Sequence, residues 1–92
     1  MSLKDIESSF YIRLSVKDET GTLAKIASVF ASQKVSIELL EQKKHANANE
    51  AWLILTTHKT SEFAIREACK ALEESAQVLE KPFVLRIFDA QS

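Results

Sequence analysis

The chain has 92 residues, of which 46% are hydrophobic and 27% are charged. A chain of this length forms one domain, and its apolar content is sufficient for a packed core and excludes a disordered segment. Twelve basic residues against thirteen acidic ones give a net charge of -1, so composition gives no sign of nucleic-acid or anionic-membrane binding. The single cysteine excludes an intrachain disulfide and favours a reducing, cytoplasmic compartment. No membrane-spanning run or signal peptide is visible.

The first half of the chain predicts a strand that leads directly into a helix. Residues 1–9 are expected to be a linker or lead-in, because they show no hydrophobic period. Residues 10–16 alternate between apolar and polar side chains, as in a strand with one buried face. Residues 17–21 form a polar turn. The helix expected over residues 22–33 has Thr20 or Thr22 as its N-cap, and its apolar positions are Leu23, Ile26, Ala27 and Phe30.

Two more strands follow without a helix between them. Residues 35–41 alternate, and their predicted buried side consists of Val35, Ile37 and Leu39. Residues 43–49 are polar and are expected to form a long hairpin loop. Residues 51–57 are apolar on both faces, which is typical of a central strand.

A second helix and a last strand complete the pattern. Thr60 or Ser61 is expected to cap the helix, whose apolar stripe comprises Ile65, Ala68, Cys69, Leu72 and Ala76. Pro82 precedes the strand at residues 83–88, since proline is tolerated at the start of a strand. The domain is therefore expected to occupy residues 10–89, with residues 90–92 as a tail.

This order of elements predicts an α+β fold, the ferredoxin-like βαββαβ arrangement. Each helix has a single apolar stripe, so both are expected to cover one face of a four-stranded antiparallel sheet. The other face is predicted to carry Tyr11, Arg13 and Val84, together with Trp52 and Ile54 or, if the register of residues 51–57 is shifted by one, the alternate set of that strand. An uncovered apolar face and two unpaired edges, at residues 35–41 and 83–88, favour a dimer or contact with a neighbouring domain.

No catalytic constellation is apparent in the sequence, so this fragment is not expected to be an enzyme. It has no Cys-His pairing at useful spacing, no glycine run for phosphate and no cluster of metal ligands. His45, His58 and Cys69 are interpreted as structural or solvated side chains rather than ligands. A small acylphosphatase-like enzyme is disfavoured because a phosphate-binding loop is missing.

The turn at residues 17–21 is the candidate binding site. Backbone N–H groups at a helix N-terminus are free and favour a carboxylate. Asp18 lies beside them and is suited to an ammonium group, so the pair of features suits a free amino acid. An ordinary strand-to-helix connection, in which Gly21 supplies a left-handed or tightly packed backbone, remains the alternative.

Residues 16–26 resemble the signature of the ACT domain family, an Asp-x-Pro-Gly-x-Leu core after a hydrophobic strand, and residues 35–38 resemble its second strand. The resemblance covers residues 9–89 and implies the βαββαβ fold with an amino acid bound between paired domains. The ligand-binding residues implied on one side are Asp18, Glu19, Thr20, Gly21, Thr22 and Leu23, with Ser36 and Ile37 from a partner. Thr20 stands where the family usually has proline, and Ser36 where many amino-acid-binding members have asparagine.

A narrower resemblance is carried by residues 10–14, 57–62 and 84–87, which are similar to the C-terminal ACT domain of bacterial homoserine dehydrogenases. It implies that catalytic and NAD(P)-binding parts lie upstream, and that this fragment itself holds no cofactor or metal. It also implies threonine feedback in the biosynthesis of aspartate-family amino acids, and a homodimer formed through an edge strand and the first helix.

Two other functions have the same order of elements. The first is a structural ACT domain that holds subunits together and binds no ligand. The second is an RNA-binding RRM, in which Tyr11 and Trp52 would stack on bases. Residues 50–56 lack the basic-Gly-aromatic pattern of an RRM, and the sequence pI is about 6.1. Both features disfavour contact with nucleic acid.

Overall fold

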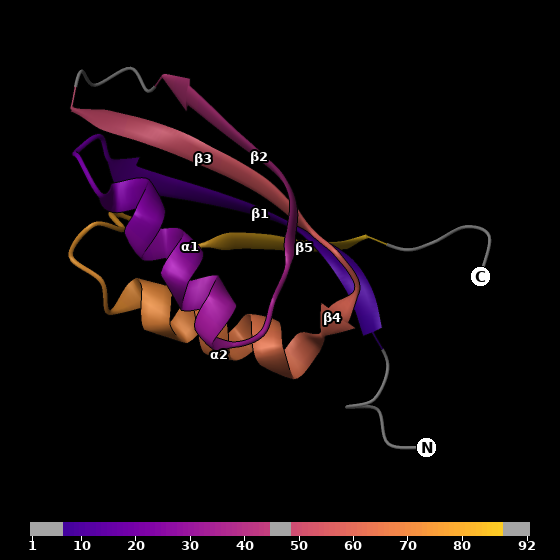
Figure 1. Ribbon diagram of the computed structural model, residues 1–92. Coiled ribbons are helices and arrows are strands. Elements are labelled where there is room, and N and C mark those ends of the chain that lie inside the picture. Colours follow the sequence, from indigo (N-terminus) through magenta and orange to yellow (C-terminus); the bar gives the residue numbers. More distant parts are fainter. Residues whose placement is uncertain (1–6, 45–48, 88–92) are drawn as a thin grey trace.

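The computed structural model describes residues 7–44 and 49–87. The elements along the chain are β1 (Glu7–Lys17), α1 (Thr22–Ser32), β2 (Ile37–Lys44), β3 (Glu50–Thr57), β4 (Thr60–Ser61), α2 (Glu62–Glu73) and β5 (Phe83–Ile87). All strand pairs are antiparallel, the sheet order is β2-β3-β1-β4, and β5 also pairs with β1. Figure 1 shows both helices on one side of the sheet. The predicted ferredoxin-like α+β fold is confirmed, and the two-residue β4 is added to the four expected strands.

β1 is the central strand and begins earlier than expected. It pairs with β3 through residues 11–17 and with β5 through residues 9–13. Residues 7–9, which were expected to belong to the lead-in, are part of this strand. The rest of the expected lead-in and the expected tail at residues 90–92 lie outside the described residues.

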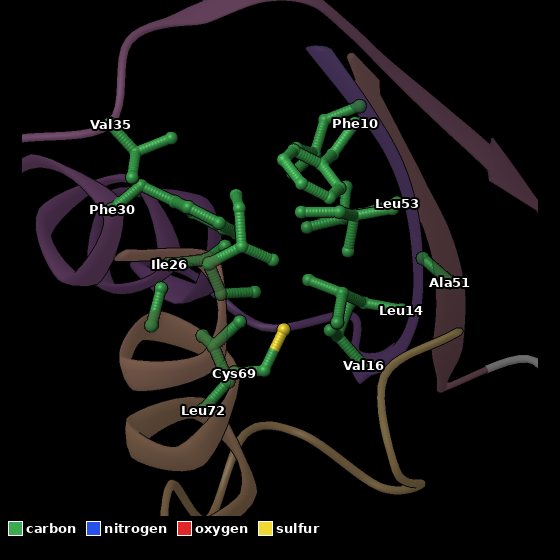
Figure 2. Packing of buried hydrophobic residues seen from close by; sticks show 14 residues of the cluster. Phe10, Leu14, Val16, Ile26, Phe30, Val35, Ala51, Leu53, Cys69 and Leu72 are labelled. Carbon is green, nitrogen blue, oxygen red and sulfur yellow. The ribbon is translucent and has the colours of Figure 1, made fainter. Parts of the chain in front are cut away.

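The core lies between the sheet and the two helices (Figure 2). Its largest fully buried side chains are Ile12, Leu14, Val16, Ile26, Phe30, Leu53, Leu55, Thr57 and Leu72. The buried side chains alternate along β1 and β3, so each of these strands turns one face toward the core. Together, these two faces supply half of the hydrophobic core. No helix in the described ranges is long and apolar enough to cross a membrane.

The start of α1 differs from the predicted cap. Gly21 is the N-cap residue, with φ 90°, and no side chain accepts a hydrogen bond there. Thr20 and Thr22 therefore do not cap the helix, and that prediction was wrong. A Cβ at Gly21 would meet nothing within 4 Å, so glycine is required by its left-handed backbone and not by close packing.

The end of α1 is closed by a Schellman motif. The Lys34 N–H donates to the Ala31 carbonyl and the Val35 N–H donates to the Phe30 carbonyl, at 2.9 Å in both cases. Lys34 holds the left-handed position with φ 61°, where glycine is usually found. Val35 is thereby turned into the core, where it is 4% exposed.

The helical stripes are only partly as predicted. In α1, Ile26 and Phe30 are buried, whereas Leu23 and Ala27 are exposed. In α2, the Ala64 N–H donates to the Ser61 hydroxyl at 3.1 Å, which confirms Ser61 as the cap. The buried α2 residues are Ile65, Ala68, Cys69 and Leu72. Ala76 lies beyond the end of α2 and is exposed.

A β-bulge changes the face that β2 turns to the core. The register with β3 shifts between Ile37 and Leu39, so one extra residue reverses the alternation after it. Leu39 is 55% exposed, and Leu40 packs against the core instead. The prediction that Leu39 is buried was therefore wrong, because alternation alone cannot reveal a bulge.

The uncovered face of the sheet carries most of the predicted residues. Ala51, Leu53 and Leu55 point into the core, so the intervening Trp52 and Ile54 lie on the open face. Tyr11 and Arg13 lie there as well, since their neighbours in β1 are buried. Val84 was placed on this face wrongly.

The pairing of β5 explains the error. Val84 is opposite Ile12, a core residue, and it packs against the core. The side chains that β5 contributes to the open face are Phe83, Leu85 and Ile87. Within the described ranges, β2 and β5 each pair with one strand, so they form the expected edges.

Candidate functional site

The turn after β1 borders a small cavity. The cavity measures about 60 Å³ and is lined by Val16, Lys17, Asp18, Glu19, Thr22, Leu23, Gln42 and Leu53. Since one water molecule needs ~10–15 Å³ of such space, the cavity holds a few waters or one polar group such as a carboxylate. It is well below the ~300–1,000 Å³ typical of a small-molecule pocket. By itself, this cavity is too small to enclose a whole small molecule.

Donor groups at the start of α1 border this cavity. The first N–H groups of a helix have no acceptor within the helix, and α1 has no side-chain cap. The Thr22 N–H donates to the Glu19 carbonyl at 3.2 Å and the Lys25 N–H to the Gly21 carbonyl at 2.9 Å. The intervening N–H groups, of Leu23 and Ala24, remain available to an anion.

The hydroxyl of Thr22 is the most unusual group at the site. Thr22 is 5% exposed, and its Oγ1 has no hydrogen-bond partner among the described residues. Leaving a buried hydroxyl unpaired costs ~1–3 kcal/mol. This hydroxyl belongs to a residue that lines the cavity, although the oxygen atom itself is buried.

Backbone hydrogen bonds on two sides hold the turn in place. The Lys17 N–H donates to the Gln77 carbonyl at 2.9 Å, and the Asp18 N–H donates to the Asn49 carbonyl at 2.8 Å. The Gln42 amide from β2 approaches the Asp18 carboxylate at 3.4 Å, a long and weak contact. Asp18 is exposed, so its carboxylate has capacity for a cationic group.

The structure brings together part of the predicted site. Asp18, Glu19, Thr22 and Leu23 line the cavity. Thr20 and Gly21 shape the turn and are exposed, but they do not line the cavity. The glycine acts through its backbone, whose left-handed conformation starts the helix.

Ser36 and Ile37 lie far from this cavity within one chain. Ile37 is opposite Thr57, whereas Lys17, next to the turn, is opposite Glu50. Positions 50 and 57 of β3 are separated by ~24 Å at ~3.4 Å per residue. Ser36 and Ile37 can therefore reach such a cavity only from another copy, and the single chain does not test their role.

Lys17 belongs to the predicted turn, but sequence reasoning missed Gln42, Val16 and Leu53 as lining residues. Gln42 lies opposite Leu53, on the core side of β2, only because of the bulge. A polar residue that points toward the core, as Gln42 does, would have been the signal for a site. The strand predicted from the sequence ended at residue 41, however, and its alternation turned the other set of side chains toward the core. Val16 and Leu53 were recognised as core residues, and core residues also form the floor of the cavity.

The other candidate chemical groups have structural roles. Burial, followed by the charge of Glu73, raises the pKa of the Cys69 thiol to about 11, so the thiol is inert at neutral pH. His58 is exposed, with Nδ1 3.7 Å from the Glu38 carboxylate, and His45 lies outside the described residues. In the described part of the chain, no three His, Cys, Asp or Glu side chains gather as metal ligands would.

Comparison with known proteins agrees with this geometry. The family profile described as ACT domain matches residues 10–77. The homoserine dehydrogenase of Neisseria gonorrhoeae is 39% identical over 85 residues, which cover 92% of this chain and 19% of that protein. The homoserine dehydrogenase of Helicobacter pylori is 32% identical over 84 residues, covering 91% of this chain and 20% of that protein.

Solved structures give the same result. A homoserine dehydrogenase from Thiobacillus denitrificans superimposes with a TM-score of 0.83 and 27% identity, over 97% of this chain and 19% of that one. The ACT domain from the GTP pyrophosphokinase of Chlorobium tepidum has a TM-score of 0.66 and 16% identity, over 89% of this chain and 100% of that one, which supports the fold alone. This chain spans about a fifth of the length of the dehydrogenases it matches. Since the family profile covers most of the chain, the chain belongs to the ACT domain family.

Proposed function

We propose that this chain is the amino-acid-binding regulatory domain of a homoserine dehydrogenase, with threonine as its effector. The similarity to homoserine dehydrogenases over more than nine-tenths of the chain supports the parent enzyme. The observation that carries the binding site is the buried, unpartnered Thr22 hydroxyl beside the free start of α1. The NAD(P)-dependent chemistry belongs to the larger part of such an enzyme, which we expect in the cytoplasm.

The groups at the turn match the two charged ends of a free amino acid. A carboxylate is favoured at the N-terminus of α1, where N–H groups and the helix dipole both attract negative charge. It would accept hydrogen bonds from the Leu23 N–H and from the Thr22 hydroxyl. The ammonium group would then lie toward Asp18, whose carboxylate is exposed and weakly engaged by Gln42.

A second copy of the domain is needed to complete this site. The cavity of about 60 Å³ accommodates one end of an amino acid but not a whole one. The homodimer that brings Ser36 and Ile37 of the partner to the turn would use the β2 edge and α1. An effector held between two copies stabilises whichever arrangement of the pair binds it better. A coupling free energy of ~1–3 kcal/mol is enough for regulation of this kind.

An ACT domain that joins subunits without a ligand is the second candidate. Two departures from the family pattern favour it. Ser36 stands in place of an asparagine and offers fewer hydrogen bonds than an amide. Thr20 stands in place of a proline and leaves the turn less rigid. The RNA-binding alternative is not supported by the structure. The Arg13 guanidinium lies 5.6 Å from the Trp52 ring centroid, so one of the two rings expected to stack on bases already contacts a cation.

Thermal unfolding in the presence of each amino acid, beginning with threonine, tests the proposal. A ligand at one hundred times its dissociation constant adds ~2.7 kcal/mol. Each kcal/mol raises the midpoint of a domain of this size by ~4–8 °C, so binding will be evident. A shift with threonine alone supports the feedback sensor. No shift with any amino acid leaves a domain that only joins subunits, or one whose site needs the larger part of the enzyme.

Asp18→Ala tests the contact with the ammonium group. The side chain is exposed, and among the described residues its carboxylate is contacted only by the distant Gln42 amide, so the variant should unfold at nearly the wild-type temperature. It should nevertheless lose the shift produced by threonine. Full retention of the shift would remove Asp18 from the site.

A further inference from the structure

The two edges of the sheet differ in their protection against another strand. β2 carries four charged residues among eight, Glu38, Glu41, Lys43 and Lys44, whereas β5 carries only Arg86 among five. Charged side chains on an edge discourage pairing with another chain. Within the described ranges, β5 pairs with β1 alone. The β5 edge is therefore open and unprotected, at the opposite margin of the sheet from β2 (Figure 1).

The side chains that β5 turns to the open face are apolar and regularly spaced. Phe83, Leu85 and Ile87 are 43%, 52% and 41% exposed. This row is symmetric about Leu85, with one apolar side chain at each end. A strand that pairs with a copy of itself around Leu85 therefore places an apolar side chain opposite an apolar side chain at every open-face position.

A groove runs along the other side of the same edge. It lies between α2 and β5, measures about 450 Å³, and has Phe10, Ile65 and Val84 among its lining residues. Glu62 is bound there by Arg86 at 2.7 Å and by Arg66 at 3.0 Å. Alternate side chains of a strand added beside β5 would enter this groove.

The far part of the groove carries an available negative charge. Glu73 also lines the groove and makes no ion pair with a described residue. It lies eleven residues beyond Glu62 in α2, or ~16 Å along the helix. Glu73 is therefore near the start of β5, at the end of the groove opposite to the Glu62–Arg86 ion pair.

We propose that β5 pairs with β5 of a second copy, antiparallel and centred on Leu85, to form one continuous sheet. Phe83 then lies opposite the partner's Ile87, and Val84 lies opposite the partner's Arg86. The partner's Arg86 then faces this groove, where Glu73 is available to it in addition to Glu62 of its own copy. The arrangement is isologous, as a two-fold dimer requires.

The neighbouring registers are less favourable. Centring the pair on Arg86 places two guanidinium groups opposite each other, and like charges in that position destabilise a sheet. Centring it on Val84 brings Pro82 into the pairing, and proline has no N–H to donate. The register centred on Leu85 avoids both problems. This interface leaves the turn and β2 free, so it does not depend on the amino-acid site.

Disulfide trapping in the 92-residue chain tests the register. Directly opposite residues have Cβ atoms ~4.5–5.5 Å apart, close to the span of a disulfide, so Leu85→Cys should form a covalent dimer on mild oxidation. Leu79→Cys is the control, since Leu79 is also an exposed leucine but lies outside both β5 and the β2 edge. We expect Leu85→Cys to cross-link at least ~10-fold faster, because only its two thiols are held opposite each other. Equal rates in the two variants would overturn the proposal.

Sedimentation of charged variants tests the interface itself. Leu85→Lys places two ammonium groups opposite each other and should weaken the dimer at least ~10-fold, whereas Leu79→Lys, outside both edge strands, should leave it unchanged. Both leucines are exposed, so both variants should unfold at the wild-type temperature. A wild-type chain that stays monomeric at its highest soluble concentration, or a dimer that Leu85→Lys weakens no more than Leu79→Lys does, would contradict the β5 interface.

Discussion

Replacing Thr22 by valine tests whether its buried hydroxyl is reserved for a ligand. The change keeps the shape of the side chain and removes Oγ1, which has no partner among the described residues. Because an unpaired buried hydroxyl costs ~1–3 kcal/mol and Thr and Val have similar helix propensities, the ligand-free variant should be about 1 kcal/mol more stable than wild type. Its unfolding midpoint should rise by ~4–8 °C.

The same substitution should weaken the binding of the effector. A hydrogen bond from a neutral hydroxyl to a charged group contributes ~1.5–3 kcal/mol, which corresponds to a loss of affinity of about tenfold or more. Thermal unfolding with and without threonine measures both effects in one experiment. The expected result is therefore a higher midpoint without ligand and a smaller shift with ligand.

Ser15 provides a matched control for this prediction. Its Oγ is the other buried side-chain atom without a partner in the described ranges, and Ser15 is 2% exposed, but it does not line the cavity. Ser15→Ala should also stabilise the chain while leaving the threonine shift intact, and Thr22→Ser should behave as wild type in binding. If Thr22→Val keeps the full threonine shift, the hydroxyl does not contact the ligand and the reasoning fails.

Further predictions concern the backbone, the helix cap and the thiol. Gly21→Ala should lower the free energy of unfolding by ~1–2 kcal/mol, because residue 21 has a left-handed backbone. Lys34→Gly should instead raise the free energy of unfolding by up to about 1 kcal/mol. Urea unfolding measures both changes, and changes of the same sign would contradict the role of positive φ. Ser61→Ala should cost ~0.5–2 kcal/mol through loss of the α2 cap, seen as a lower thermal midpoint, and an unchanged midpoint would show that the cap is dispensable. For Cys69, a pKa of about 11 favours the neutral thiol. Labelling of this thiol at pH 8 should therefore be much slower in the folded chain than in the urea-unfolded chain. In the folded chain, the labelling rate should rise as the pH approaches 11. Equal labelling rates in the folded and unfolded chain would show that burial does not protect the thiol.

The two surfaces discussed above lie at opposite margins of the sheet. The amino-acid cavity is bordered by β2 through Gln42, and the proposed dimer contact is on β5. A chain with two separate isologous contacts can assemble beyond a dimer, and an effector bound on one side need not disturb the other. Measuring the assembly state with and without threonine therefore separates the regulatory contact from the structural one.

The sequence by itself determined the elements and their order. Alternation along residues 10–16, the apolar run at residues 51–57 and the helical spacing in α2 are local signals, because each reflects the geometry of one element. The Ser61 cap and the left-handed Gly21 are equally local, since a cap or a positive φ depends on a few neighbouring residues. The fold class and the position of the turn follow from these signals.

Only the tertiary structure decided which faces and edges these elements present. The bulge in β2 exposes Leu39 and brings Gln42 to the cavity, and the register of β5 against β1 turns Val84 inward. The loss of a partner for the Thr22 hydroxyl likewise depends on what packs around it. Pairing between distant strands fixes these features, and a shift of one residue reverses every side chain, so no local pattern in the chain records them.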